Sequence, residues 1–535
     1  MNTTSAPRAA ARPRRFTLPR TLQCGGTLLA ALCVAACAVG PDYRKPPVEI
    51  PATFKEGVDW QRAQANPQAS LSSQWWQLYQ DDALRHLVEQ ALKANQSIVA
   101  AEAAYRLALA TVEANTASLF PVVTAGISAT RSGTGSGAAT ATTVAGVRNS
   151  VSANVAASWE VDLWGQIRRE IESAKESAQA SDAQLAGERL SIAASVATDY
   201  FALRQADIDV ASLKQQQQID ARILDIVRAA FLQGTASNDD VLTAQDTLEL
   251  VIAELQTTQT SREQDEHALA VLTGVPPAGF SITPELNYVF VTPAVPLALP
   301  SQLLERRYDV VSAERTAAAA NAKIGVAEAA FFPVLDLSAE GGFQHNTFAH
   351  LFSLPSRVWT LGPDLAATIF DGGARTAAVH EAQATYDEDV AAYRGTVLTA
   401  FQNVEDSLSS WNHLQQQELA YANILARNQQ LFASERAQLL AGTASEENLL
   451  TQQLTLVQAE QNLKDTQSLL SQSSVALIKN LGGGWQWDAG KGAAVSGAQA
   501  PGQGSAAGSS ASSATTKNGA TAADPDTARM TVQAQ

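Results

Sequence analysis

The sequence predicts a mainly α-helical chain with membrane-type β-strands, arranged as two tandem copies of one structural plan. Three observations predict this fold. Short motifs recur in the same order in both halves, each half contains a long stretch poor in glycine and proline, and each half contains two segments in which apolar and polar residues alternate.

The internal repeat is clearest in two motifs. The step Phe120-Pro121 returns as Phe332-Pro333, and the four letters Gly-Thr-Ala-Ser at 234–237 return unchanged at 442–445. Shared composition does not explain agreement this local. Each copy is therefore expected to run helix, strand, loop, strand, long helix, turn, long helix.

Residues 1–36 form a predicted signal peptide. Arginines precede an apolar run at 27–36, which is too short for a permanent membrane span. The step Val34-Ala35-Ala36-Cys37 resembles the lipobox of bacterial lipoproteins. Cys37 is therefore expected to carry S-diacylglycerol and an N-acyl chain such as palmitate, and to begin an extended segment at 37–81. The alternative is an ordinary secretory signal with an incidental cysteine.

The two repeats are expected at 82–275 and 301–487, joined by a proline-rich linker at 276–300. Their first helices are predicted at about 82–117 and 300–330, each ending before a Phe-Pro step. The long helices after Gly165 and from Ala374 would each reach about 100 Å. In the helix after each turn an apolar residue recurs every seventh position, with one break at Arg262, which predicts coiled-coil packing.

Four segments have the period-two alternation of strands. They begin near Pro121, Ser150, Leu335 and Trp359, and each runs for about ten residues, the length of an outer-membrane strand. Soluble strands alternate in the same way, so the evidence is the set of four rather than any one. Trp159, Trp164 and Trp359 are expected at the membrane interface.

Four strands cannot close a barrel, and unpaired strand edges are not tolerated in hydrocarbon. The chain is therefore expected to pool its strands with other copies. Two copies would give eight strands with a filled interior, whereas three would give twelve strands around a passage.

Composition excludes several classes of function. The net charge is -16, which argues against binding to nucleic acid or anionic lipid. The three cysteines all lie in the first 37 residues and the six histidines are scattered, so we expect neither a disulfide framework nor a metal site. No catalytic constellation is visible, so we expect no enzyme activity and no cofactor. Residues 488–535 are rich in Gly, Ala, Ser, Gln and Thr, which predicts a disordered tail.

Several motifs resemble one known family, the TolC-like trimeric outer-membrane efflux ducts of Gram-negative bacteria, in their NodT-type lipoprotein branch. The motifs are Cys37, Gly40-Pro41-Asp42-Tyr43, Trp75-Trp76, Trp159-Glu160-Val161-Asp162-Leu163-Trp164-Gly165, Arg306-Arg307-Tyr308-Asp309 and Phe370-Asp371-Gly372-Gly373. Tyr308 stands where the family usually has proline.

The resemblance implies a homotrimer with a twelve-stranded β-barrel in the outer membrane, continued by an α-barrel across the periplasm. It also implies docking onto a periplasmic adaptor protein and an inner-membrane transporter of the RND type. Such a duct conducts passively and does no chemistry, because the pump supplies the energy.

The resemblance places the closing end of the duct at the turns 234–242 and 442–450. The aspartates that form rings in relatives fall here on Asn448 and Thr451, so that part of the pattern is missing. Four nearby acids are the gate candidates, with Asp240 preferred: Asp239, Asp240, Glu446 and Glu447. A ring of carboxylates would favour cations. The alternative is that they are exposed first-turn acids favoured by the helix dipole.

The leading hypothesis is thus a passive exit duct of a tripartite efflux system. Its rival is a periplasmic lipoprotein adaptor or a structural coiled-coil protein without a channel. The sequence leaves the transported substrate open.

Overall fold

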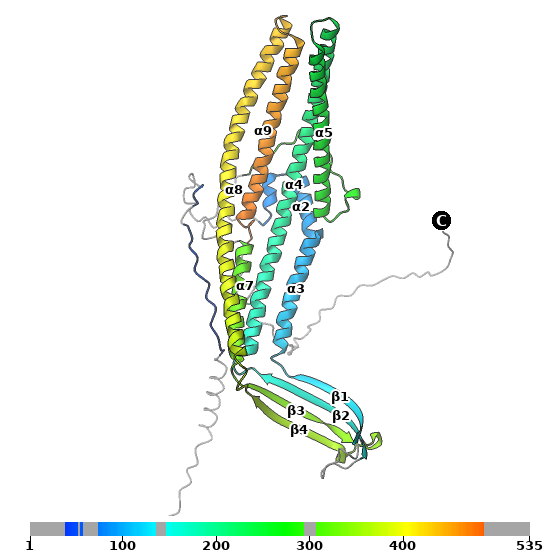
Figure 1. The fold of residues 1–535 in the computed structure, drawn as a ribbon, viewed down its shortest axis with the longest axis vertical. Coiled ribbons are helices and arrows are strands. Elements are labelled where there is room, and N and C mark those ends of the chain that lie inside the picture. Colours follow the sequence, from blue (N-terminus) through cyan, green and yellow to red (C-terminus); the bar gives the residue numbers. More distant parts are fainter. Residues whose placement is uncertain (1–37, 52–53, 57–72, 135–145, 294–306, 486–535) are drawn as a thin grey trace, which may run out of the picture.

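The fold is an elongated set of long helices with a β-sheet at one end (Figure 1). The computed structural model describes residues 38–51, 54–56, 73–134, 146–293 and 307–485. The expectations for the signal peptide, for Cys37 and for the tail at 488–535 lie outside these residues.

The first half contains η1 (Trp75–Tyr79), α2 (Asp82–Ala94), α3 (Gln96–Ala117), β1 (Val122–Thr134), β2 (Gly146–Val161), α4 (Gln166–Leu232) and α5 (Asn238–Leu272). After η3 (Pro277–Gly279), the second half contains α7 (Tyr308–Ala329), β3 (Val334–His345), η4 (Phe348–His350), η5 (Leu354–Ser356), β4 (Arg357–Ala366), α8 (Ala374–Leu440) and α9 (Glu446–Asn480). The order α3-β1-β2-α4-α5 thus recurs as α7-β3-β4-α8-α9. The lengths also recur, since α4 and α8 each have 67 residues and α5 and α9 each have 35.

The prediction of one continuous first helix from 82 to 117 is wrong. Asn95 divides it into α2 and α3, with an extended backbone at φ -66° and ψ 129°. The Asn95 carboxamide oxygen caps α3 by accepting from the backbone N–H groups of Ser97 and Ile98. Its nitrogen donates to the backbone carbonyl of Leu272, 3.0 Å away, which fastens this break to the end of α5.

The helices form a layer with two coiled-coil extensions. α4 packs along α3 and α7, and α7 packs along α8. Beyond this layer, α5 returns along α4 and α9 returns along α8, and α9 also contacts α4 (Figure 1). None of the helices in the described part of the chain is both long and apolar enough to cross a membrane.

The main hydrophobic core lies at the middle of the long helices. There η1, α2 and the linker after α5 pack against α4, α8 and α9, and bury large aromatic side chains such as Trp75, Tyr200, Phe201 and Tyr393. This core is remote from the strands, so the sheet has to find its own apolar environment.

The four strands form one antiparallel sheet in the order β1-β2-β3-β4. The alternation in the sequence predicts a fourth strand that continues to Ile369, but β4 ends at Ala366. Its last partner is Val334, the first residue of β3, and Pro333 before it has no N–H to extend the ladder. Trp164 also lies outside the strands, where its indole N–H donates to the Pro333 carbonyl.

Candidate functional site

The strand register gathers the apolar side chains on one face of the sheet. Ala125 pairs with Val155, Trp159 with Leu337, and Ala339 with Leu361, so the alternation of each strand is in phase with its neighbour. These side chains are open to their surroundings: Ile127 is 76% exposed, Leu361 is 74% exposed and Trp359 is 75% exposed. An apolar face of this extent fits hydrocarbon rather than water.

The opposite face of the sheet is polar. It carries hydrogen-bonded serines, with the Ser128 and Ser152 hydroxyls 2.8 Å apart, and a bond from Asn154 to Glu340. It also carries every acid of the four strands: Glu160, Asp336, Glu340 and Asp364. A sheet with one hydrocarbon-compatible face and one hydrated face is built to separate lipid from an aqueous passage.

The outer strands β1 and β4 each have one paired edge within the described residues. Their free edges present rows of backbone N–H and C=O groups beside the apolar face. In lipid such groups need partners, because no water is available to satisfy them.

The far ends of the long helices form two matching turns. Gly234 and Gly442 follow α4 and α8 with φ of 75° and 74°, a left-handed backbone that glycine adopts without strain. The next backbone N–H, of Thr235 or Thr443, reaches back to the carbonyl of Ala230 or Gln438, each at 3.0 Å. These turns hold the four gate candidates at the tips of two helical hairpins, α4–α5 and α8–α9.

Asp240 belongs to a capping box at the start of α5. Its Oδ2 accepts from the Ser237 backbone N–H and from the Ser237 hydroxyl, both at 2.8 Å, while the Ser237 hydroxyl oxygen accepts from the Asp240 N–H. These bonds from Ser237 lower the pKa of Asp240, so the carboxylate stays ionised. Asp239, beside it, is exposed in the first turn of the helix.

The second turn differs in its charges. Glu446 forms a two-pronged ion pair with Arg222 of α4, with Nε–Oε1 at 2.8 Å and Nη2–Oε2 at 3.1 Å. Bonds from Arg222 lower the pKa of Glu446. The pair joins the first hairpin to the second, and sequence reasoning missed it because 224 residues separate the partners. Glu447, the next residue, is exposed.

The positions without the expected aspartate have local roles. The Asn448 backbone N–H donates to the Ser445 hydroxyl at 3.1 Å, and the Thr451 hydroxyl donates to the Glu447 carbonyl at 2.9 Å. Asn448 thus occupies in the second turn the place of Asp240 in the first, without a charge.

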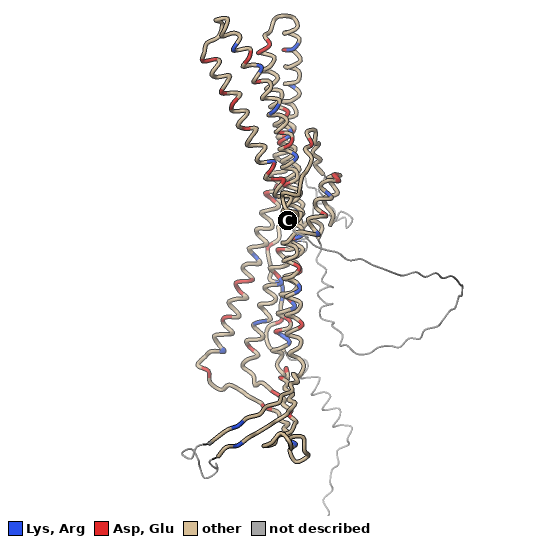
Figure 2. Tube along the Cα trace, turned by 90° about the vertical axis from the view of Figure 1, so that its right-hand side faces the viewer, with Lys and Arg blue, Asp and Glu red and all other residues tan. Residues whose placement is uncertain are grey.

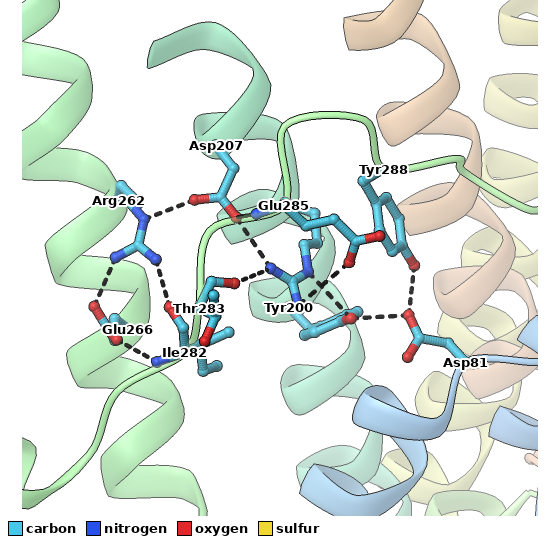
Figure 3. Close-up of polar contacts among 10 residues, drawn as sticks. Asp81, Tyr200, Asp207, Arg262, Glu266, Ile282, Thr283, Glu285 and Tyr288 are labelled. Atoms are coloured by element: carbon cyan, nitrogen blue, oxygen red, sulfur yellow. Dashed lines mark hydrogen bonds and ion pairs between the residues drawn. The ribbon is translucent and has the colours of Figure 1, made fainter. Parts of the chain in front are cut away.

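A polar network at the middle of the helices explains the break in the heptad (Figure 3). Arg262 of α5 donates through Nε to Asp207 of α4 at 2.7 Å and through Nη1 to Glu266 at 2.7 Å. Its Nη2 reaches the backbone carbonyl of Ile282 in the linker at 2.8 Å. Arg262 therefore fastens α4, α5 and the linker together at a position where the coiled-coil pattern calls for leucine.

The network continues towards Asp81, at the start of α2. Arg204 also donates to Asp207, at 3.1 Å, and to the Thr283 carbonyl at 2.8 Å. The hydroxyls of Tyr200 and Tyr288 both donate to Oδ2 of Asp81 at 2.8 Å (Figure 3). Burial, then the Asp81 charge, raises the pKa of Tyr288, and burial is the main cause that raises the pKa of Tyr200. Both phenols stay protonated, and they hold the start of α2 against α4 and the linker.

A sheet that separates lipid from a hydrated face, continued by long paired helices, defines a membrane channel subunit with a helical extension. The model of the outer membrane efflux protein family matches residues 87–275 and 299–483. The chain belongs to this family.

Individual relatives agree with this assignment. The toluene efflux pump outer membrane protein TtgC of Pseudomonas putida is 30% identical over 85% of this chain and 94% of its own length. The pyoverdine export outer membrane protein OpmQ of the same species is 31% identical over 88% of this chain and 99% of its own length. The solved outer-membrane channel OprN superposes with a TM-score of 0.74 at 28% identity, covering 84% of this chain and 100% of OprN.

The resemblance to efflux ducts is therefore confirmed, as is the location in the outer membrane of a Gram-negative bacterium. The chain is an outer-membrane efflux channel protein, and its family is a transport family rather than an enzyme family. The rival hypothesis, a periplasmic lipoprotein adaptor or a structural coiled-coil protein without a channel, does not agree with these matches.

Proposed function

We propose that three copies of this chain form the exit duct of a tripartite efflux system. In this duct β4 of each copy pairs with β1 of the next, which closes a twelve-stranded barrel. The observation that carries the proposal is the sheet itself, since it combines an exposed apolar face with two unpaired edges. Closure removes both edges, and three copies leave room for a passage lined by the polar face.

The helices would continue the barrel as a periplasmic tube built from two structural repeats in each chain. The matching lengths of α4 and α8, and of α5 and α9, support this repeat. The tips of the tube would meet a periplasmic adaptor protein, and through it an inner-membrane transporter of the RND type. Leu232 and Leu440, the last residues of α4 and α8, are 85% and 84% exposed and would supply apolar contacts to the adaptor.

The mature chain would also be anchored by lipid on Cys37, with acyl chains in the outer membrane. Apolar contacts at the tips and lipid at the other end would hold the duct across the periplasm. Several acyl chains together make such an anchor effectively permanent.

Two measurements on the detergent-purified full chain test the proposal. Native mass spectrometry is expected to give a mass of three chains, and planar bilayers are expected to show stepwise single-channel currents. A monomer, or a trimer that conducts no current under any condition that opens the tips, would contradict it.

At the tips we propose that carboxylates of Asp239, Asp240 and Glu447, together with the Arg222–Glu446 pair, form the closed end of the tube. Asp240→Ala should raise single-channel conductance and reduce cation preference. Because Asp240 also caps α5, the matched variant is Asp240→Asn, which keeps an acceptor for Ser237 and removes the charge. If the gate depends on charge, both variants respond; if only the alanine variant responds, Asp240 acts as a cap and the gate lies elsewhere.

A further inference from the structure

The acids of the strands and two of their three arginines lie on opposite faces of the sheet. All four strand acids lie on the polar face, and the apolar face carries two full charges, Arg131 of β1 and Arg357 of β4. Both arginines stand at the loop ends of their strands, away from the helices. Figure 2 shows basic residues in blue on the strands beyond the ends of the helices.

Each arginine lies at about the same distance along its own strand from the end nearest the helices. Arg131 follows Val123 by eight residues along β1, and Arg357 precedes Leu365 by eight residues along β4. Eight strand residues span about 26 Å, or about 20 Å of height at the usual strand tilt. The apolar band of an outer-membrane barrel is about 25 Å tall, so in the proposed barrel both guanidinium groups would lie near the headgroup border of the outer leaflet.

Nothing in the described part of the protein neutralises these arginines. Both are exposed, and neither has an ion-pair partner among the described residues. Aromatic residues lie beside Arg357 on the same face of the sheet. Trp359 is two residues along β4, and Phe343 is the register partner of Arg357 and contacts Phe352 with ring centroids 5.5 Å apart. A guanidinium above aromatic and aliphatic side chains matches an anionic headgroup above acyl chains.

We propose that this border, Arg131 and Arg357 with Trp359, binds the phosphate groups of an anionic glycolipid in the outer leaflet. The inference rests on the proposed trimer, in which β4 of one copy adjoins β1 of the next. Closure of the ring would place Arg357 of one copy and Arg131 of the next copy on adjacent strands. The trimer would then have three equivalent sites. The net charge of -16 argues against anionic lipid for the chain as a whole, but the acids of the strands face the passage and leave the lipid face locally cationic.

The sheet offers a matched control. Arg148 of β2 is exposed at the same loop end, but its register partner is Ser132, so it lies on the polar face. Arg148→Gln therefore removes one positive charge at the same end of the strands without touching the lipid face.

The test measures binding of diphosphorylated lipid A and of its dephosphorylated form to the purified full-length trimer in phosphatidylcholine nanodiscs. Wild-type protein should prefer the phosphorylated lipid. Arg131→Gln and Arg357→Gln should each weaken that binding about fivefold, and the double variant about 30-fold, as expected for about one charge interaction per arginine. Arg148→Gln should bind like the wild type.

Equal affinity of the wild-type trimer for the two lipids would overturn the lipid site, and this comparison needs no variant. An equal loss in Arg148→Gln would also overturn it, by showing a general charge effect. A wild-type protein that purifies as a monomer would instead contradict the proposed function, so the two failures are distinguishable.

Discussion

At the scale of single residues, the most informative position is Arg262, because it interrupts an otherwise regular heptad. The sequence shows the interruption but not its purpose. The partners of Arg262 come from α4, α5 and the linker, and only the folded chain brings them together. Asp207, with its side chain fully buried, is the centre of this network because it accepts from Arg204, Arg262 and the Glu285 backbone N–H.

Replacing Asp207 tests this role. Asp207→Asn should lower the free energy of unfolding by about 3–5 kcal/mol, because it leaves two arginines without their shared buried counter-charge. Urea unfolding of the detergent-solubilised protein, followed by circular dichroism, measures the change. Asp246→Asn, on an exposed position of α5, is the control and should change stability by less than about 0.5 kcal/mol. Equal unfolding midpoints for the two variants would show that the network does not hold the helices together.

At the scale of helices, the α4–α5 and α8–α9 hairpins meet at two neighbouring carboxyl groups, Asp209 of α4 and Asp465 of α9. The Gln205 side-chain nitrogen donates to Asp209 at 3.0 Å and also to Asp465, and the Gln461 side-chain nitrogen donates to Asp209 at 3.0 Å. Burial, then the charge of Asp209, raises the pKa of Asp465 to about 7. Burial likewise raises the pKa of Asp209, on which Glu254 of α5 also acts.

This junction predicts a pH dependence with a definite sign. The pKa of Asp465 is higher in the folded chain than in the unfolded chain, where a free aspartate titrates near 3.9. The folded state therefore keeps a proton that the unfolded state loses, and stability falls as the pH rises from about 4 to about 7. The thermal midpoint should be higher at pH 5.5 than at pH 8, and Asp465→Asn should reduce this difference. An unchanged difference in the asparagine variant would remove Asp465 from the account.

The packing of α4 on α7 gives a second prediction at this scale. A Cβ atom on Gly187 would lie 2.1 Å from Cδ2 of Tyr308, so the tyrosine ring occupies the space that the glycine leaves. Gly187→Ala should therefore cost about 1–3 kcal/mol of stability, and combination with Tyr308→Ala should recover part of it.

The control is Gly395 of α8, where an added Cβ meets no heavy atom within 4 Å. Gly395→Ala should stabilise the helix by up to about 1 kcal/mol, because alanine favours a helix more than glycine does. Urea midpoints of Gly187→Ala, Tyr308→Ala, the double variant and Gly395→Ala measure both effects. A neutral Gly187→Ala would contradict the close approach. Tyr308 stands where the resemblance leads one to expect proline, and its ring lies against Gly187.

Strands and long helices could be predicted from the sequence because each repeats a pattern over many residues. The alternation predicted which side chains share a face of the sheet. The seven-residue period predicted that the paired helices pack as coiled coils. The division at Asn95 could not be predicted, because the hydrogen bond that holds this break in place joins Asn95 to the carbonyl of Leu272, 177 residues along the chain. The gate candidates lie in the turns at the helix tips, where the sequence repeat places them, and their role as a gate stays a prediction. The capping role of Asp240 and the Arg222–Glu446 pair depend on side-chain geometry that sequence spacing does not contain.

At the scale of the whole molecule, the sheet is the part whose surface and edges are not covered within one chain. The helices bury their cores within the chain, whereas the sheet leaves its apolar face and the edges of β1 and β4 open. The same strands that are unsatisfied in one copy would be fully paired in a closed ring of three. The central claim is therefore the contact between β4 of one chain and β1 of the next.

Cysteine crosslinking between these strands measures that contact most directly. A set of variants would carry one cysteine in β1 between 123 and 130 and one in β4 between 358 and 365. The control pair, Ala157→Cys with Ala339→Cys, joins register partners on the central strands β2 and β3. The account predicts that correctly paired β1 and β4 cysteines give a ladder of linked chains that ends at three, while the control pair links only within one chain. A set that never links separate chains, or a ladder that continues beyond three, would contradict it.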